Sequence, residues 1–292
     1  MSHPANVART SFHTVAADSV DVFYREAGAP DAPVLLLLHG FPSSSHMYRD
    51  LIPLLATRYR VIAPDLPGFG FTSVPAGRDY RYTFDNLAAT VAAFVQALAL
   101  EKYALYVFDY GAPVGLRLAA AHPGRVTALV SQNGNAYLEG LGDAWLPIKQ
   151  YWADPAAHRG DMRNFLTLEA TKWQYTHGVA DPDTVAPEAY YLDALLMQRP
   201  GNAEIQLDLF LDYASNLALY PVFQQFFRDT QVPTLAIWGK NDPFFIPPGA
   251  EAFRRDNPNA EVKLLDTGHF ALETHVDEIA AEIHKLLGRA LA

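Results

Sequence analysis

The chain has 292 residues, half of them hydrophobic, with no cysteine and a formal charge of −10 from 22 basic and 32 acidic side chains. This length suits one large α/β domain or a core with an inserted subdomain. No Lys/Arg cluster stands out, which excludes nucleic acid and anionic membrane surfaces as expected partners. Without cysteine there is no disulfide or thiolate chemistry, and we expect a cytoplasmic protein.

The sequence also lacks the features of two further classes, which are proteins targeted to or across a membrane and proteins that depend on a cofactor. Residues 1–10 have no apolar core of a signal peptide, and no apolar stretch approaches the roughly 18 residues that a membrane span needs. Neither a metal-ligand cluster nor a nucleotide-binding fingerprint occurs, so we expect no metal and no other cofactor. We therefore expect a protein that acts on a small molecule, as a monomer or a homodimer.

The first hundred residues predict strands around buried apolar runs. Residues 11–16 and 20–26 alternate and predict an antiparallel hairpin at a sheet edge. The continuous apolar run 34–38 is typical of a strand buried on both faces, and 60–64 predicts the next strand. A helical period follows over 83–98, and its first residue, a threonine, suits an N-cap.

A strand, a sharp turn and a helix are predicted next. The apolar, β-prone run 103–108 stops at Asp109, and an apolar helical pattern covers 114–122. Gly111 and Ala112 between them are small, as needed where strand and helix nearly touch. Asp109 at the apex is expected at positive φ, which Asp tolerates better than most residues with a Cβ.

The later part of the chain changes in character and then returns to strands. After a strand at 126–130, aromatic residues, Pro and Gly interrupt short helical stretches, with no convincing buried strand. The sheet resumes at 233–238 and 261–265, and 276–287 predicts a closing amphipathic helix.

These patterns divide the chain in two. We expect an α/β core made of 1–134 and 229–292, and a helical cap made of 135–228. The cap would lie over the carboxyl end of the sheet, where open α/β sheets bind ligands.

An acidic residue at the apex of the turn has a chemical use. A carboxylate attacks an sp³ carbon that carries a leaving group and forms an alkyl-enzyme ester. Hydrolysis of that ester needs a general base and an oxyanion hole. The alternative interpretation is that Asp109 only caps the helix that follows.

The loop His39-Gly-Phe-Pro42 follows a buried strand and could supply part of an oxyanion hole. We expect the backbone N–H of Phe41 and that of Tyr110, next to Asp109, to be the two donors. Each such donor contributes a few kcal/mol. His39 is expected to orient the loop.

An acid and a histidine follow the last two predicted strands. Asp242 lies in Gly239-Lys-Asn-Asp242, and His269 lies in Asp266-Thr-Gly-His269. The chain order is nucleophile, acid, histidine, and Asp242 would orient His269 for activation of water. Asp242 could instead be a turn residue before Pro243. Asp266 is a rival acid, although it is too near His269 in sequence to orient the ring.

Taken together, these motifs resemble the α/β-hydrolase superfamily, in the branch of epoxide hydrolases and haloalkane dehalogenases with an Asp nucleophile. The similarity covers residues 34 to 292 and is weakest in the cap. The resemblance implies an α/β-hydrolase fold, with a mostly parallel central sheet flanked by helices and a helical cap inserted after strand 6. It also implies a triad of Asp109, Asp242 and His269 and a small apolar organic substrate.

In epoxide hydrolases, cap tyrosines protonate the epoxide oxygen. Tyr213 fits the second of these tyrosines. Ile148 stands at the place of the first, so Tyr151 or Tyr175 would have to substitute. For any single cap tyrosine, packing under the cap is the alternative role.

In haloalkane dehalogenases, the halide is held by an indole beside the nucleophile and by an Asn in the first loop. This chain has Tyr110 and Phe41 there, so Trp152 or Trp173 of the cap would have to hold a halide. Fluoroacetate-type dehalogenases carry Arg residues just after the nucleophile, which hold the carboxylate of a haloacid. This chain has Tyr110 and Pro113 there, which disfavours a haloacid substrate.

The sequence therefore supports three hypotheses. The first is a cofactor-independent hydrolase of the epoxide-hydrolase type, which converts an epoxide to a vicinal diol. The second is a haloalkane or haloacid dehalogenase with the same triad. The third is a hydrolase-like binding protein without catalysis, which the intact Asp109, Asp242 and His269 disfavour.

Overall fold

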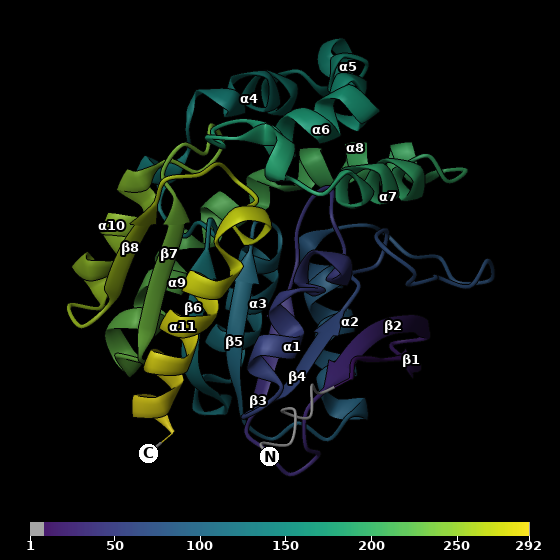
Figure 1. Cartoon of the computed structure of the whole chain (residues 1–292). Coiled ribbons are helices and arrows are strands. Elements are labelled where there is room, and N and C mark those ends of the chain that lie inside the picture. Colours follow the sequence, from purple (N-terminus) through teal and green to yellow (C-terminus); the bar gives the residue numbers. More distant parts are fainter. Residues whose placement is uncertain (1–8, 292) are drawn as a thin grey trace.

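The computed structural model describes residues 9–291, and its centre is a sheet of eight strands in the order β1-β2-β4-β3-β5-β6-β7-β8. β1 and β2 form an antiparallel hairpin at one edge, and β2 also pairs antiparallel with β4. The other pairs are parallel (Figure 1). The strands are β1 (Ser11–Ala17), β2 (Val20–Ala27), β3 (Val34–Leu38), β4 (Arg60–Pro64), β5 (Tyr103–Phe108), β6 (Val126–Gln132), β7 (Thr234–Gly239) and β8 (Glu261–Leu265). The predicted fold class is confirmed.

Helices cover both faces of this sheet, which explains the unbroken apolar runs of its central strands. Leu36 and Leu38 of β3 join one hydrophobic cluster, and Leu35 and Leu37 join the other. The core helices are α1 (Leu51–Leu55), α2 (Phe84–Ala97), α3 (Gly111–Ala121), α10 (Pro247–Asp256) and α11 (Leu272–Ala290). α1 and α11 pack together in the second cluster, while α2, α3 and α10 contribute to the first.

The segment between β6 and β7 contains only helices and loops among its described residues. Its α-helices are α4 (Leu146–Ala153), α5 (Pro155–His158), α6 (Leu168–Thr176), α7 (Pro187–Met197), α8 (Asn202–Asp212) and α9 (Ala214–Thr230). Figure 1 shows α4 to α8 gathered over one end of the sheet, which is the expected place of a cap. α9 instead returns along the core and packs against α3 and α10. The division of the chain at 134 and 228 stays a prediction.

Two α-helices of the core were not predicted, and two others begin earlier than predicted. α1 and α10 are short, and their prolines, Pro53 in α1 and the Pro247-Pro248 pair that opens α10, obscure the helical period. α3 begins at Gly111 because Pro113 fits the first helical turn, where its missing N–H is not needed. α11 begins at Leu272 and not at 276, because it includes a kink at His275 (φ −130°) that interrupts the helical period of the sequence.

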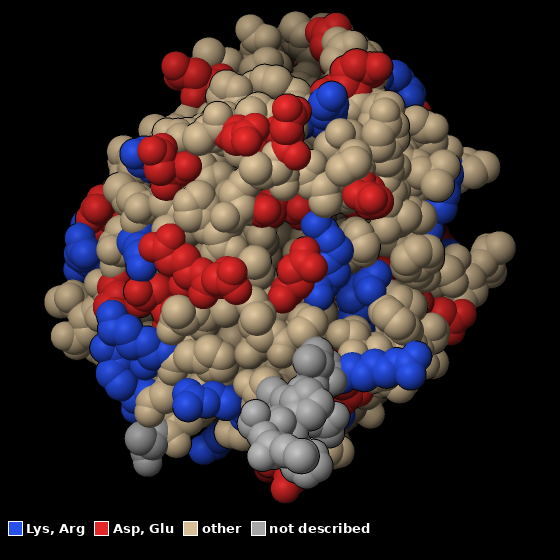
Figure 2. Space-filling model, in the orientation of Figure 1, with Lys and Arg blue, Asp and Glu red and all other residues tan. Residues whose placement is uncertain are grey.

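Two observations concern the expectation that neither nucleic acid nor a membrane is a partner. On the face shown in Figure 2, acidic and basic side chains are interspersed, with acidic groups gathered across its middle. Among residues 9–291, no helix combines the length and the apolar character that crossing a bilayer requires. The expectation that no signal peptide is present concerns residues 1–10, and residues 1–8 lie outside the described part of the chain.

Gly111 gives the first prediction. A Cβ added there would lie 2.1 Å from the carbonyl oxygen of Leu38 and 2.9 Å from that of His39, and backbone cannot give way cheaply. Gly111→Ala is expected to lower the free energy of unfolding by about 2 kcal/mol, since overpacking outweighs the roughly 1 kcal/mol that Ala gains in a helix. Urea unfolding measures it.

The matched control is Gly77→Ala, because a Cβ at Gly77 meets nothing within 4 Å. This control should leave stability within about 0.5 kcal/mol of the parent chain. Equal stability of the two variants would contradict the close approach of α3 to the end of β3.

Candidate active site

Asp109 lies at the apex of the turn between β5 and α3, with φ +48° and 7 % of its surface exposed. Its Oδ1 accepts hydrogen bonds from the backbone N–H groups of Phe41 and Tyr110, each at 2.6 Å. The N-terminus of α3 directly behind it favours negative charge. One carboxylate oxygen is thus held by two donors, and the other is left to the cavity described below.

His269 and Asp242 lie on the loops after β8 and β7, beside this turn. The Nδ1 of His269 is 2.6 Å from the Oδ2 of Asp242, and its Nε2 is 3.9 Å from the Oδ2 of Asp109. Asp242 is 2 % exposed, and its Oδ1 accepts from the N–H of Phe244 at 2.8 Å. The imidazole therefore stands between two buried carboxylates, with its tautomer fixed by Asp242.

The rival acid lies elsewhere. Asp266 is exposed and pairs with Asn241 at 3.0 Å and Lys240 at 3.2 Å. His39 has the placement expected of a structural residue. Its Nε2 accepts from the N–H of Leu66 at 2.9 Å, and burial lowers the pKa of the ring, which keeps it neutral.

Sequence reasoning missed the amides that hold the acid and the histidine. Asn133 follows β6 at φ +45°, donates to the Oδ2 of Asp242 at 2.8 Å and accepts from the N–H of Gly239 at 2.9 Å. Gln132 donates to the carbonyl oxygen of His269 at 2.9 Å. The sequence did offer a signal, because the adjacent amides Gln132 and Asn133 come just after the predicted strand 126–130. This strand lies next to β7, which leads to Asp242.

Burial and charge act in opposite directions on the ionisable groups. Burial raises the pKa of Asp109 to about 6, although the charge of His269 and the N–H groups of Phe41 and Tyr110 oppose it. Burial alone would lower the pKa of His269, but the charge and hydrogen bond of Asp242, together with Asp109, outweigh it and raise that pKa. Asp109 and His269 thus each favour the charged form of the other, and burial opposes both.

A small cavity joins these groups to the cap. It encloses about 20 Å³, which is room for about one water molecule. Its walls are mostly aromatic and come from both the core and the cap: Phe41, Asp109, Tyr110, Trp145, Ile148, Phe165, Gln174, Phe210, Phe244 and His269. An organic ligand can reach Asp109 only if cap side chains move.

The five predicted leaving-group residues do not line this cavity. The hydroxyl of Tyr151 donates to the carbonyl oxygen of Leu207 at 3.3 Å, and that of Tyr175 donates to Asp193 at 2.5 Å, so both are engaged in packing. Tyr213 lies behind the wall, with its ring 4.4 Å from that of Trp145, and its buried hydroxyl lies beside that of Tyr220.

The two tryptophans are also displaced from the cavity. The indole N–H of Trp152 donates to the carbonyl oxygen of Phe210 at 2.7 Å. Trp173 is 43 % exposed and packs against His177 and Phe244. The sequence could not place these side chains, because the two faces of a short cap helix look alike when both carry aromatics.

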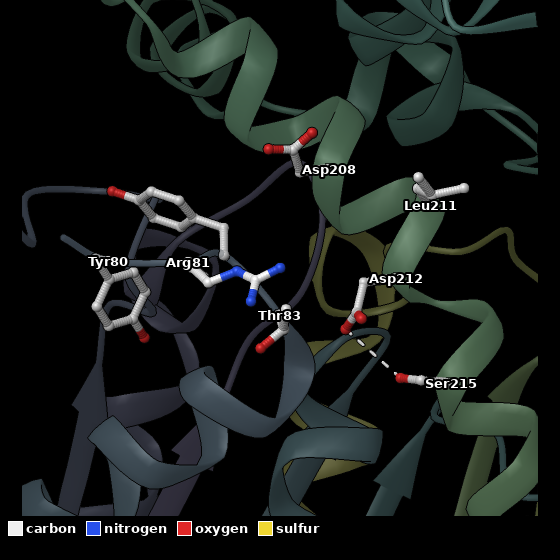
Figure 3. Close-up of a pocket in the computed structure, with 8 residues that line it drawn as sticks. Tyr80, Arg81, Thr83, Asp208, Leu211, Asp212 and Ser215 are labelled. Atoms are coloured by element: carbon white, nitrogen blue, oxygen red, sulfur yellow. Dashed lines mark hydrogen bonds between the residues drawn. The ribbon is translucent and has the colours of Figure 1, made fainter. Parts of the chain in front are cut away.

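A larger groove of about 550 Å³ lies elsewhere, between segment 80–83 of the core and helices α8 and α9 (Figure 3). Its acidic groups are already paired, since Asp208 binds Arg159 at 2.8 Å and Asp212 accepts from the N–H of Phe84 at 2.7 Å. It shares no lining residue with the cavity at Asp109. Among the described residues, no cluster of His, Asp and Glu could hold a metal ion.

Comparison with known proteins identifies the family. Residues 33–276 match the family model described as alpha/beta hydrolase fold. The chain belongs to the α/β-hydrolase family. The family places a nucleophile, an acid and a histidine in that chain order, which is the order of Asp109, Asp242 and His269.

Individual proteins are also similar to this chain. An uncharacterized hydrolase of Saccharomyces cerevisiae is 51% identical over 278 residues, covering 93% of this chain and 95% of the relative. Haloalkane dehalogenase 2 of Mycobacterium tuberculosis is 29% identical over 276 residues, 88% of each chain. The crystal structure of haloalkane dehalogenase DbeA from Bradyrhizobium elkani has a TM-score of 0.76 at 23% identity, covering 97% of this chain and 99% of that one.

Asp242 and Asp266 provide a matched test of the site. In Asp242→Asn, burial of His269 is no longer opposed by the adjacent charge, so its pKa should fall well below the wild-type value. Asp266→Asn removes an equal charge from the same neighbourhood, on an exposed side chain, and should leave the pKa of His269 unchanged. Titration of the imidazole by NMR measures both. The reverse ranking of the two variants would show that Asp266 is the partner.

Proposed function

We propose that this protein is a hydrolase that forms an ester between Asp109 and an sp³ carbon of a small apolar substrate, and that the substrate is an epoxide, opened to a vicinal diol. The observation that carries the proposal is the asymmetric setting of the Asp109 carboxylate. Its Oδ1 accepts from both N–H groups, and its Oδ2 lies 3.9 Å from His269, in a cavity with aromatic walls. An acid that only capped a helix would not need the second donor from Phe41.

In the first step, the Oδ2 of Asp109 attacks a ring carbon and the carbon–oxygen bond of the epoxide breaks. The released oxygen takes a proton from a cap hydroxyl. Tyr213 is favoured among the three predicted tyrosines, because the hydroxyls of Tyr151 and Tyr175 donate to cap oxygens, whereas that of Tyr213 lies beside another hydroxyl, that of Tyr220. Its ring packs on Trp145 and Tyr110, two walls of the cavity, so the proposal requires these rings to shift before its hydroxyl can reach the substrate.

In the second step, the ester leaves Asp109 without charge, which removes one cause of the raised pKa of His269. In its neutral form, the imidazole then takes a proton from water, which attacks the ester carbonyl carbon. The resulting oxyanion forms on Oδ1, where the N–H groups of Phe41 and Tyr110 already lie. Collapse releases the diol oxygen, which takes the proton from His269, and the proton of the new carboxyl restores Tyr213.

A dehalogenase with the same two steps is the second candidate, and the similarity to haloalkane dehalogenase 2 of Mycobacterium tuberculosis favours it. A departing halide needs N–H donors. The indole N–H groups of Trp145 and Trp152 donate to the carbonyl oxygens of Phe244 and Phe210, and Trp173 does not line the cavity, so a halide would depend on the amide of Gln174.

The ester intermediate gives the decisive prediction. In His269→Gln the base for the second step is missing, so turnover should stop with substrate attached to Asp109. Intact-mass analysis after incubation with a panel of epoxides and alkyl halides measures the adduct, and Asp109→Asn is the control that should gain none. An adduct from epoxides only supports the first candidate, and from halides only the second. No adduct from any member would contradict the ester mechanism and favour a binding protein without catalysis.

The pH dependence of the first step gives another prediction. A carboxylate attacks carbon and a protonated carboxyl does not, so alkylation should be lost as pH falls through about 6, the raised pKa of Asp109. In His269→Gln the midpoint should move higher, because the charge that lowers this pKa is gone. Rapid-quench measurement of the burst in the parent chain, and of adduct formation in the variant, tests both. A midpoint near the ordinary value of 3.8 would refute the buried setting of Asp109.

A further inference from the structure

Gln174 is a polar residue of the cavity that the proposed mechanism does not use. It lies on α6 of the cap and is 4 % exposed. It lines the same cavity as Asp109 and His269. Its Nε2 is buried and makes no hydrogen bond with any described residue. Buried polar groups are nearly always hydrogen-bonded, so an unpaired amide in a ligand cavity needs an explanation.

The backbone just after Gln174 is tied to the loops of the site. Just after α6, the carbonyl oxygen of Gly178 accepts from the side chain of Asn241 at 2.9 Å, on the loop that also carries Asp242. A Cβ at Gly268 would lie 1.8 Å from the carbonyl oxygen of His177, so the end of α6 rests on the loop of His269. These contacts tie the backbone beside Gln174 to the two loops that form the site.

The rest of the lining offers little competition for a polar ligand group on the cap side. Trp145, Ile148, Phe165 and Phe210 are the other cap residues of the cavity, and the single polar group among them, the indole N–H of Trp145, donates to the carbonyl oxygen of Phe244. The unpaired hydroxyl of Tyr110 belongs to the core side, next to Asp109. Among the cap residues of the lining, Gln174 is therefore the one with an unpaired amide nitrogen.

We propose that Gln174 is a specificity-determining residue whose amide N–H binds a second oxygen of the substrate, such as an ether or carbonyl oxygen, distinct from the epoxide oxygen. The inference rests on the proposed function and narrows its substrate class. An amide N–H does not give up its proton near neutral pH, so it suits a neutral acceptor better than an oxygen that must be protonated. A substrate without that acceptor leaves the amide unpaired in an apolar pocket and is disfavoured.

A pair of substrates of equal size and shape tests this directly. Methyl glycidyl ether and terminal pentene oxide differ only in an ether oxygen that replaces a methylene group, and the reacting epoxide is the same. The parent chain should favour the ether in kcat/KM by about tenfold or more, mainly through KM. In Gln174→Met the preference should fall to about twofold or less. Gln174→Leu removes the same donor with a different shape and should give the same result.

Phe165→Leu is the matched control, because Phe165 lines the same cavity from the cap without a polar atom. This variant should keep the preference for the ether even if both kcat/KM values change. An equal loss on both substrates in Gln174→Met would assign the amide to the leaving oxygen or to the attacking water, and would overturn the proposal. Absence of any preference in the parent chain would overturn it too.

Failure of this proposal is distinguishable from failure of the proposed function. In a His269→Gln background, the rate of ester formation from each epoxide is read by intact mass, with and without Gln174→Met. Ester formed from both epoxides at equal rates refutes the role of Gln174 and leaves the ester mechanism standing. Methoxyethyl chloride and butyl chloride are the corresponding halide pair. Absence of an ester from both epoxides and both halides refutes the role of Gln174 and the ester mechanism together.

Discussion

Two backbone N–H groups that converge on one oxygen of Asp109 are the contact on which the rest of the site depends. The turn that brings them together needs a left-handed backbone at Asp109. It also needs glycine on the facing loop, since a Cβ at Gly40 would lie 2.2 Å from the Oδ1 of Asp109 and 2.5 Å from the nitrogen of Tyr110. β3 and β5 are adjacent in the sheet, so both loops leave it at the same edge. The sheet thereby fixes which oxygen is held and which is free.

The cap adds the second constraint, which is the exclusion of water. A cavity of about 20 Å³ with aromatic walls leaves Asp109 poorly solvated, and this burial raises its pKa to about 6. The charge of His269 and the two N–H donors limit the rise. A carboxylate kept ionised mainly by its partners, with little water around it, is better placed to attack carbon than a hydrated one. The same closure means that the cap must move for a substrate to enter.

The sequence predicted the features that depend on local pattern and chain order. The apolar runs gave the central strands, and the strand, small residues and helix around Asp109 gave the turn. The positions of Asp242 and His269 after two strands placed them at one edge of the sheet. The cap could not be predicted in this way, because tertiary packing decides which face of each short helix points inward. Tyr151, Tyr175 and Trp152 are engaged with other parts of the cap, whereas Gln174, in the same helix as Trp173 and Tyr175, lines the cavity.

The path of the oxygen atoms tests the central claim most directly. In a single turnover in water enriched in oxygen-18, with enzyme in excess over epoxide, attack by Asp109 on carbon transfers an unlabelled carboxylate oxygen to the diol. The account predicts unlabelled diol and a label in the peptide that contains Asp109. Labelled diol with an unlabelled peptide would show that water attacks the epoxide directly, and would contradict the account.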